Sequence, residues 1–114
     1  MIKIVKDTIS LRELQTMSKE LFGDYVKAVV DVAQGIAAFG GELHADEEAE
    51  LLEQGSRQED LWGINLYPEK SKNEWIEFDS MINVRPSQGN RSRNVESEEL
   101  REKVRKIINE MISR

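Results

Sequence analysis

The chain has 114 residues, a formal net charge of −6, 39% hydrophobic residues and no cysteine. This length and composition predict one domain over residues 1–114 that buries its own core without disulfides or thiolate metal sites. The acidic balance argues against nucleic acid, which needs clustered cations, and no apolar run approaches the ~20 residues that span a membrane, so we expect a soluble cytoplasmic protein.

The N-terminal residues predict a strand followed by a helix. Residues 2–5 are mostly apolar and fit a short strand. Ser10–Glu13 matches a capping box, in which the serine side chain accepts a hydrogen bond from the glutamate amide. An apolar face with helical spacing continues from there to Leu21, and Gly23 ends the helix.

A hairpin and a second helix are predicted next. Apolar and polar residues alternate over residues 25–33, and Gln34-Gly35 offers a turn into the apolar residues 36–39, which favours two antiparallel strands over a long helix. A helix over residues 46–54 follows, because Asp46 is a good N-cap and the first turn is acidic. We expect two of its side chains to face the core, Ala49 and Leu52.

Two more strands are predicted after a polar loop. Residues 61–67 alternate in character and end at Pro68. Residues 75–84 form a longer alternation, which predicts a long or bulged antiparallel partner. On its second face Trp75 and Met81 would leave apolar area exposed, so a homodimer is one interpretation.

The clearest helical pattern lies at the C-terminus. Apolar residues from Leu100 to Ile112 recur at helical spacing, and Ser97 or Asn94 caps the helix. The element order β-α-β-β-α-β-β-α predicts an α+β fold. We expect a two-layer sandwich, in which three helices cover a mostly antiparallel sheet of about five strands.

A basic loop stands out in this acidic chain. Residues 85–93 carry three arginines and no acid, directly before the last helix. Backbone amides at a helix start and planar guanidinium groups both suit a carboxylate or phosphate. We identify five candidate ligand-binding residues here: Arg85, Asn90, Arg91, Ser92 and Arg93. Capping, or pairing with the acidic segment 42–60, is the alternative, and the spacing matches no phosphate-binding motif.

The only histidine, His44, lies between acids. In an extended chain Glu42, His44 and Asp46 would share one face, and Asp79 from the long strand could join them. The candidates for catalysis are therefore His44, Asp46 and Asp79. No paired histidine motif accompanies them, so a structural role for His44 is the simpler interpretation, and we assign no metal or cofactor.

Three segments carry a family resemblance. The run 40–46, the run 58–65, and the strand and loop from Ile76 through Arg85 to Ser92 together resemble a small prokaryotic family of uncharacterised single-domain proteins. The resemblance spans nearly the whole chain. It implies a prokaryotic origin, and it implies no activity, ligand or catalytic residue.

Three functional interpretations remain open. The leading prediction is a non-enzymatic binding or protein-interaction module that presents the arginine loop to a small anion or an acidic group of a protein partner. The first alternative is a metal-dependent, hydrolase-like enzyme that uses His44 and nearby carboxylates. The second alternative is a structural subunit of a larger complex.

Overall fold

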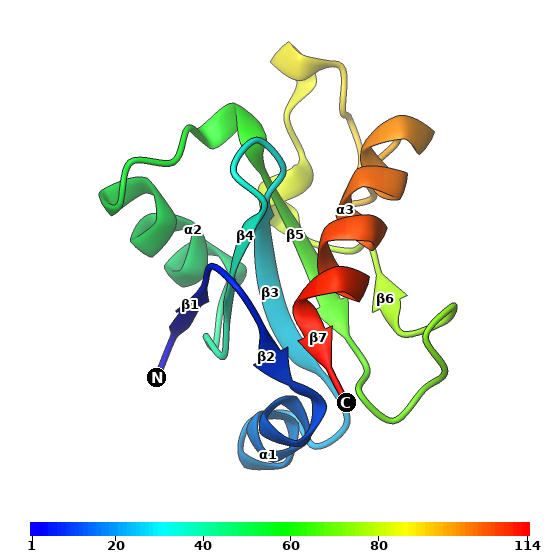
Figure 1. Ribbon diagram of the computed structural model, residues 1–114. Coiled ribbons are helices and arrows are strands. Elements are labelled where there is room, and N and C mark those ends of the chain that lie inside the picture. Colours follow the sequence, from blue (N-terminus) through cyan, green and yellow to red (C-terminus); the bar gives the residue numbers. More distant parts are fainter.

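The computed structural model describes residues 1–114 as a five-stranded antiparallel sheet with three α-helices (Figure 1). The helices are α1 (Leu11–Glu20), α2 (His44–Glu53) and α3 (Glu98–Met111). The strands of the sheet are β1 (Lys3–Val5), β3 (Val26–Asp31), β4 (Ile36–Phe39), β5 (Leu61–Leu66) and β6 (Ile76–Glu77). Two shorter strands pair with each other in parallel, β2 (Ile9–Ser10) and β7 (Ile112–Ser113). These elements confirm the predicted α+β class.

The sheet is built around the predicted hairpin. Its strand order is β1-β4-β3-β5-β6, and every neighbouring pair is antiparallel. Strands β3 and β4 pair with Asp31 opposite Ile36, and the turn between them places Gly35 at a φ of +70°. Glycine suits this turn because it adopts a positive φ without a steric penalty.

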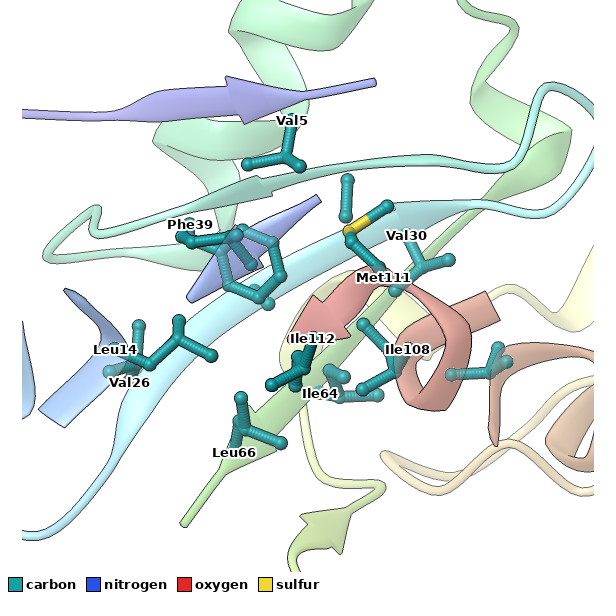
Figure 2. Close-up of a cluster of buried hydrophobic side chains, with 14 of the residues drawn as sticks. Val5, Leu14, Val26, Val30, Phe39, Ile64, Leu66, Ile108, Met111 and Ile112 are labelled. Carbon is teal, nitrogen blue, oxygen red and sulfur yellow. The ribbon is translucent and has the colours of Figure 1, made fainter. Parts of the chain in front are cut away.

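The larger core lies between one face of the sheet and helices α1 and α3 (Figure 2). Alternate residues of β3 point into it, and they contact apolar residues from both helices: Val26, Ala28, Val30, Leu14, Val104 and Ile108. Helix α1 begins as its sequence predicts, because the Ser10 hydroxyl accepts a hydrogen bond from the Glu13 amide at 3.1 Å. Ile9 and Leu14, on either side of this cap, are both buried.

A smaller core lies on the opposite face of the sheet, under α2. Val29 of β3 contacts Leu51 of α2 there, together with three apolar residues from the neighbouring strands: Ile36, Ala38 and Leu61. The helices therefore flank both faces of the sheet, and α2 stands alone on its side (Figure 1).

The predicted inner face of α2 is wrong. The helix begins at His44 with Leu43 as its N-cap, not Asp46, and its buried residues are His44, Glu47 and Leu51. Ala49 is exposed, and Leu52 is 39% exposed. Residues three and four apart share a helix face, so the buried set follows from the position of His44 against the sheet.

The predicted long strand over residues 75–84 is also wrong, because β6 has only two residues. The chain leaves the sheet and forms a short 3-10 turn, Met81–Asn83, which the Ser80 hydroxyl caps. The Asn83 side chain then bonds both backbone groups of Gly63, with its Oδ1 2.8 Å from the amide and its Nδ2 3.0 Å from the carbonyl. A side chain thus takes the place of a strand partner at this edge of β5.

This turn separates the two residues on which the dimer interpretation was based. Trp75 is 1% exposed and belongs to the larger core, whereas Met81 is 66% exposed. The apolar face that they were expected to share does not form, and the homodimer stays a prediction. No helix has the length and apolar character that a membrane span requires.

Candidate functional site

Arg85, the first residue of the predicted anion site, is committed to the fold. Its guanidinium and Nε donate to three backbone carbonyls, those of Gln58, Leu61 and Ile82, and also to the Gln88 side chain. The guanidinium carbon also lies 4.4 Å from the centre of the Trp62 ring. Because internal acceptors and an aromatic ring surround this group, Arg85 holds the loop against β5.

Asn90 is equally committed. It is buried, and its Nδ2 donates to the carbonyls of Asn83, Ser92 and Asn94, while its Oδ1 accepts from the Glu96 amide. Gly89 beside it has a φ of +80°, which allows the chain to reverse. Through these hydrogen bonds, Asn90 holds the basic loop in its folded conformation.

The amides of the loop already bind a carboxylate of the same chain. Glu96 accepts from the Arg91 amide at 3.0 Å. A hydrogen bond from the Ser92 side chain, and then the one from the Arg91 amide, lower the pKa of Glu96. The guanidinium of Arg91 itself makes no hydrogen bond or ion pair within the chain. The Glu96 carboxylate thus occupies the place, just before α3, where the sequence predicted that a ligand anion would bind.

The acidic segment 42–60 meets the basic loop without an ion pair. The contacts run from Arg85 and the Gln88 amide group to the carbonyls of Gln58 and Glu59. Within the acidic segment, Glu59 pairs with Arg57. Backbone hydrogen bonding therefore joins the two segments.

Arg93, the last residue of this loop, lines a cavity of about 190 Å³, which we call the α2 cavity. Its Nε lies 2.6 Å from a carboxylate oxygen of Asp79. The cavity lies where the start of α2 meets β3 and the Met81–Asn83 turn. Its lining residues are Lys27, Leu43, His44, Ala45, Ser80, Met81, Ile82 and Arg93.

His44 is a neutral acceptor at this cavity. It is 7% exposed, and its Nε2 lies 2.7 Å from the carbonyl oxygen of Ile64. A carbonyl oxygen only accepts, so Nε2 carries the ring proton and donates it. Burial lowers the pKa of His44 to about 4, so the ring is neutral at pH 7. Its Nδ1 is left as a hydrogen-bond acceptor with no partner in the chain.

Lys27, a residue of β3 that no sequence motif pointed to, completes the site. Its side chain is half-buried, and its ammonium lies 5.3 Å from the centre of the Phe22 ring and 5.9 Å from that of Tyr25. No carboxylate or carbonyl of the chain bonds it. The signal that could have found Lys27 is its place as the one cation in the apolar strand β3.

The N-terminal end of α2 adds positive potential. Its N-cap residue, Leu43, offers no side-chain hydrogen bond, and the amides of His44 and Ala45 donate to no acceptor of the chain. Free first-turn amides and the helix dipole favour a negative charge at such an end. The α2 cavity therefore combines an unpaired ammonium, a guanidinium and a helix start.

The three predicted catalytic residues do not come together. Asp46 is exposed, while Asp79 is bound by Arg93 and stands near His44. No three histidine, aspartate or glutamate side chains converge so that they could hold a metal ion. His44, Asp46 and Asp79 therefore form no three-ligand site, because α2 turns Asp46 away from the sheet, and a catalytic role for these residues stays a prediction.

A larger cleft, of about 470 Å³, lies elsewhere, between α1 and the loop that follows β5. Its cations are three exposed side chains, Lys70, Lys72 and Arg114. The indole N–H of Trp75, at its base, already donates to Asn109. It therefore lacks a half-buried, unpaired cation such as Lys27 at the α2 cavity.

Comparison with known proteins gives a family and no activity. No curated protein and no solved structure matches the chain. Residues 3–111 match the family model described as "Protein of unknown function (DUF5674)". This match confirms the resemblance to an uncharacterised family, whereas prokaryotic origin stays an expectation. The chain therefore belongs to the DUF5674 family of proteins of unknown function.

Proposed function

We propose that this protein is a non-enzymatic binding module and that its α2 cavity binds the anionic group of a ligand, a carboxylate or a phosphate. The observation that carries the proposal is the state of Lys27. Lys27 lines the cavity, and its ammonium has no carboxylate or carbonyl acceptor within the chain. A half-buried cation without a partner gains a charge-assisted hydrogen bond when an anion arrives.

Arg93 and the start of α2 support the same ligand chemistry. The Arg93–Asp79 pair is partly exposed, and exposed ion pairs contribute little stability, so the guanidinium can share a second anion at small cost. The free amides of His44 and Ala45 add donors at the same end of the cavity. These groups all favour a negative charge at the cavity.

The polar groups of the cavity favour binding over catalysis. His44 donates through Nε2 to a carbonyl, and the Asp79 carboxylate is held by Arg93. The Ser80 hydroxyl accepts from the Ile82 amide. No hydrogen bond links a nucleophile to a base, which is the arrangement that covalent catalysis needs.

The predicted arginine loop keeps a role in this proposal. Arg85 and Asn90 fasten the loop, and the loop places Arg93 at the cavity. Arg91 and Ser92 remain predicted contacts for a larger anionic ligand. Phosphate binding at their amides would first require displacement of Glu96.

A thermal-shift titration with glutarate and with inorganic phosphate tests the proposal. At a ligand concentration tenfold above Kd, binding adds about 1.4 kcal/mol to the free energy of unfolding, which raises Tm by several degrees. We expect this rise for the unmodified protein and for Lys103→Met, an exposed lysine of α3, and its loss in Lys27→Met. An equal rise in all three proteins would place the anion elsewhere and contradict the proposal.

A further inference from the structure

We infer that the natural ligand of the α2 cavity is an acidic side chain in a peptide segment of a partner protein, followed or preceded by an apolar residue. This inference rests on the proposed function and names its ligand class. Three features of the cavity lead to it: its size, its apolar rim and its neutral histidine.

The cavity is too small for a typical metabolite or cofactor. Its volume is about 190 Å³. Sites for small-molecule ligands usually enclose roughly 300–1,000 Å³ and bury most of the ligand. A space of this size suits one inserted side chain, with the rest of the ligand outside on the surface.

The surface around the cavity is apolar. Leu43 is 59% exposed and Met81 is 66% exposed, and both line the cavity, together with the partly buried Ile82. A free anion bound between Lys27 and Arg93 would leave this apolar area in water. A peptide whose neighbouring residue is apolar would cover Leu43 and Met81 and gain from their burial.

His44 discriminates between kinds of anion. Its Nδ1 accepts hydrogen bonds and cannot donate one at neutral pH, because the ring proton is on Nε2. A fully ionised dicarboxylate has no donor to offer it. A peptide carries its carboxylate next to backbone N–H groups, so it can satisfy the cation and the acceptor together.

The charge of the site matches a single carboxylate. Lys27 and Arg93 contribute two positive charges, and Asp79 offsets one of them. The remaining charge stands out in a chain with a net charge of −6. An acidic residue flanked by apolar ones complements this patch, whereas a strongly acidic segment would be repelled by the rest of the surface.

The test is an NMR titration of the whole chain with acetyl-Leu-Glu-Leu-amide, acetyl-Leu-Gln-Leu-amide and glutarate. We expect the Glu peptide to bind about tenfold more tightly than the Gln peptide, since only the carboxylate pairs with Lys27 and Arg93. We also expect it to bind more tightly than glutarate, and to shift the backbone resonances of Leu43, Ala45 and Met81.

Two variants separate the rim from the anion position. Met81→Ser should weaken the Glu peptide several-fold and leave glutarate binding unchanged. Val84→Ser, which removes another exposed apolar side chain just outside the cavity, should change neither. Both sites are exposed, so the fold should tolerate the substitutions.

The outcomes distinguish the inference from the proposed function. If glutarate binds as tightly as the Glu peptide and Met81→Ser has no effect, the ligand is a small anion and the inference fails, while the proposed function stands. Equal binding of the Glu and Gln peptides also overturns the inference. If no probe binds at the cavity, the proposed function fails as well.

Discussion

Asp31 is a fully buried carboxylate that accepts four hydrogen bonds and has no cationic partner. Its Oδ1 accepts from the amides of Ala33 and Gln34, and its Oδ2 accepts from the Gln34 side chain and the Ser56 hydroxyl. The carboxylate thereby shapes the β3–β4 turn and ties it to Ser56, in the loop after α2. Hydrogen bonding can hold a charge inside a protein when donors surround it.

Asp31→Asn is therefore expected to lower the free energy of unfolding by roughly 2–3 kcal/mol, because the new NH₂ group faces donors where an oxygen accepted. Urea denaturation measures the change. The matched control is Asp24→Asn in an exposed turn, for which we expect a change within about 0.5 kcal/mol. Equal effects at the two positions would show that the buried network contributes nothing.

His44 makes stability depend on pH. Its pKa falls from 6.5 to about 4 on folding, since burial disfavours the charged ring. The stability it contributes is fully present above pH 6.5 and is lost as the pH falls through about 4. The shift corresponds to about 3 kcal/mol. Buried Glu47, whose pKa is raised by burial, acts in the opposite sense: its contribution is present below pH 4.5 and is lost as the pH rises.

His44→Gln should remove the loss of stability between pH 6.5 and pH 4, because glutamine can still donate to the Ile64 carbonyl and does not ionise. Guanidinium denaturation at several pH values, compared with the unmodified protein, measures the difference in slope. Glu47 is present in both proteins, so its opposing contribution cancels. Parallel pH profiles would contradict the assignment of a neutral, buried His44.

At the scale of elements, α2 packs on the sheet through Leu51 and not through the neighbouring Leu52. Leu51 is fully buried under the helix, whereas Leu52 is 39% exposed. Leu51→Ala should lower the free energy of unfolding by roughly 2–4 kcal/mol, through lost burial and a residual cavity. Leu52→Ala should cost less than about 1 kcal/mol. If chemical denaturation gives a larger loss of stability for Leu52→Ala than for Leu51→Ala, then Leu52 faces the core, as the sequence predicted.

Elements with local signals could be predicted from the sequence. Helix α1 has its Ser10 cap, α3 its apolar stripe, and the β3–β4 hairpin its alternation around Gly35. The chain beyond β6 could not be predicted, because the contact that diverts it joins Asn83 to Gly63 across 20 residues. A side chain added at Gly63 would lie 2.6 Å from Ser80, so this approach depends on an absent Cβ.

The candidate site was predicted in part. His44 and Asp79 were predicted in one group and Arg93 in another, and each lies at or beside the α2 cavity. Their grouping depends on where α2 meets the turn at Met81, which no local pattern encodes. Lys27 was passed over because strand alternation explained a polar residue there. What makes it a candidate site residue is the lack of a carboxylate or carbonyl acceptor in the folded chain.

At the scale of the whole molecule, the α2 cavity differs from the other charged segments, because its cation Lys27 is not paired within the chain. The acidic segment 42–60 and the basic loop 85–93 lie against each other through backbone carbonyls. Glu96 occupies the loop amides, and Asp79 shares Arg93. After these pairings, the half-buried Lys27 ammonium has neither a carboxylate nor a carbonyl acceptor.

A titration of the isotope-labelled protein with glutarate, followed residue by residue by NMR, is the most direct test of an anion site at the α2 cavity. Such a site predicts saturable shifts at the cavity residues Lys27, His44, Ala45 and Arg93, and their loss in Lys27→Met. Saturable shifts confined to Arg91 and Ser92 would instead place the anion in the arginine loop. Those shifts, or no saturable shift at any residue, would contradict the central claim.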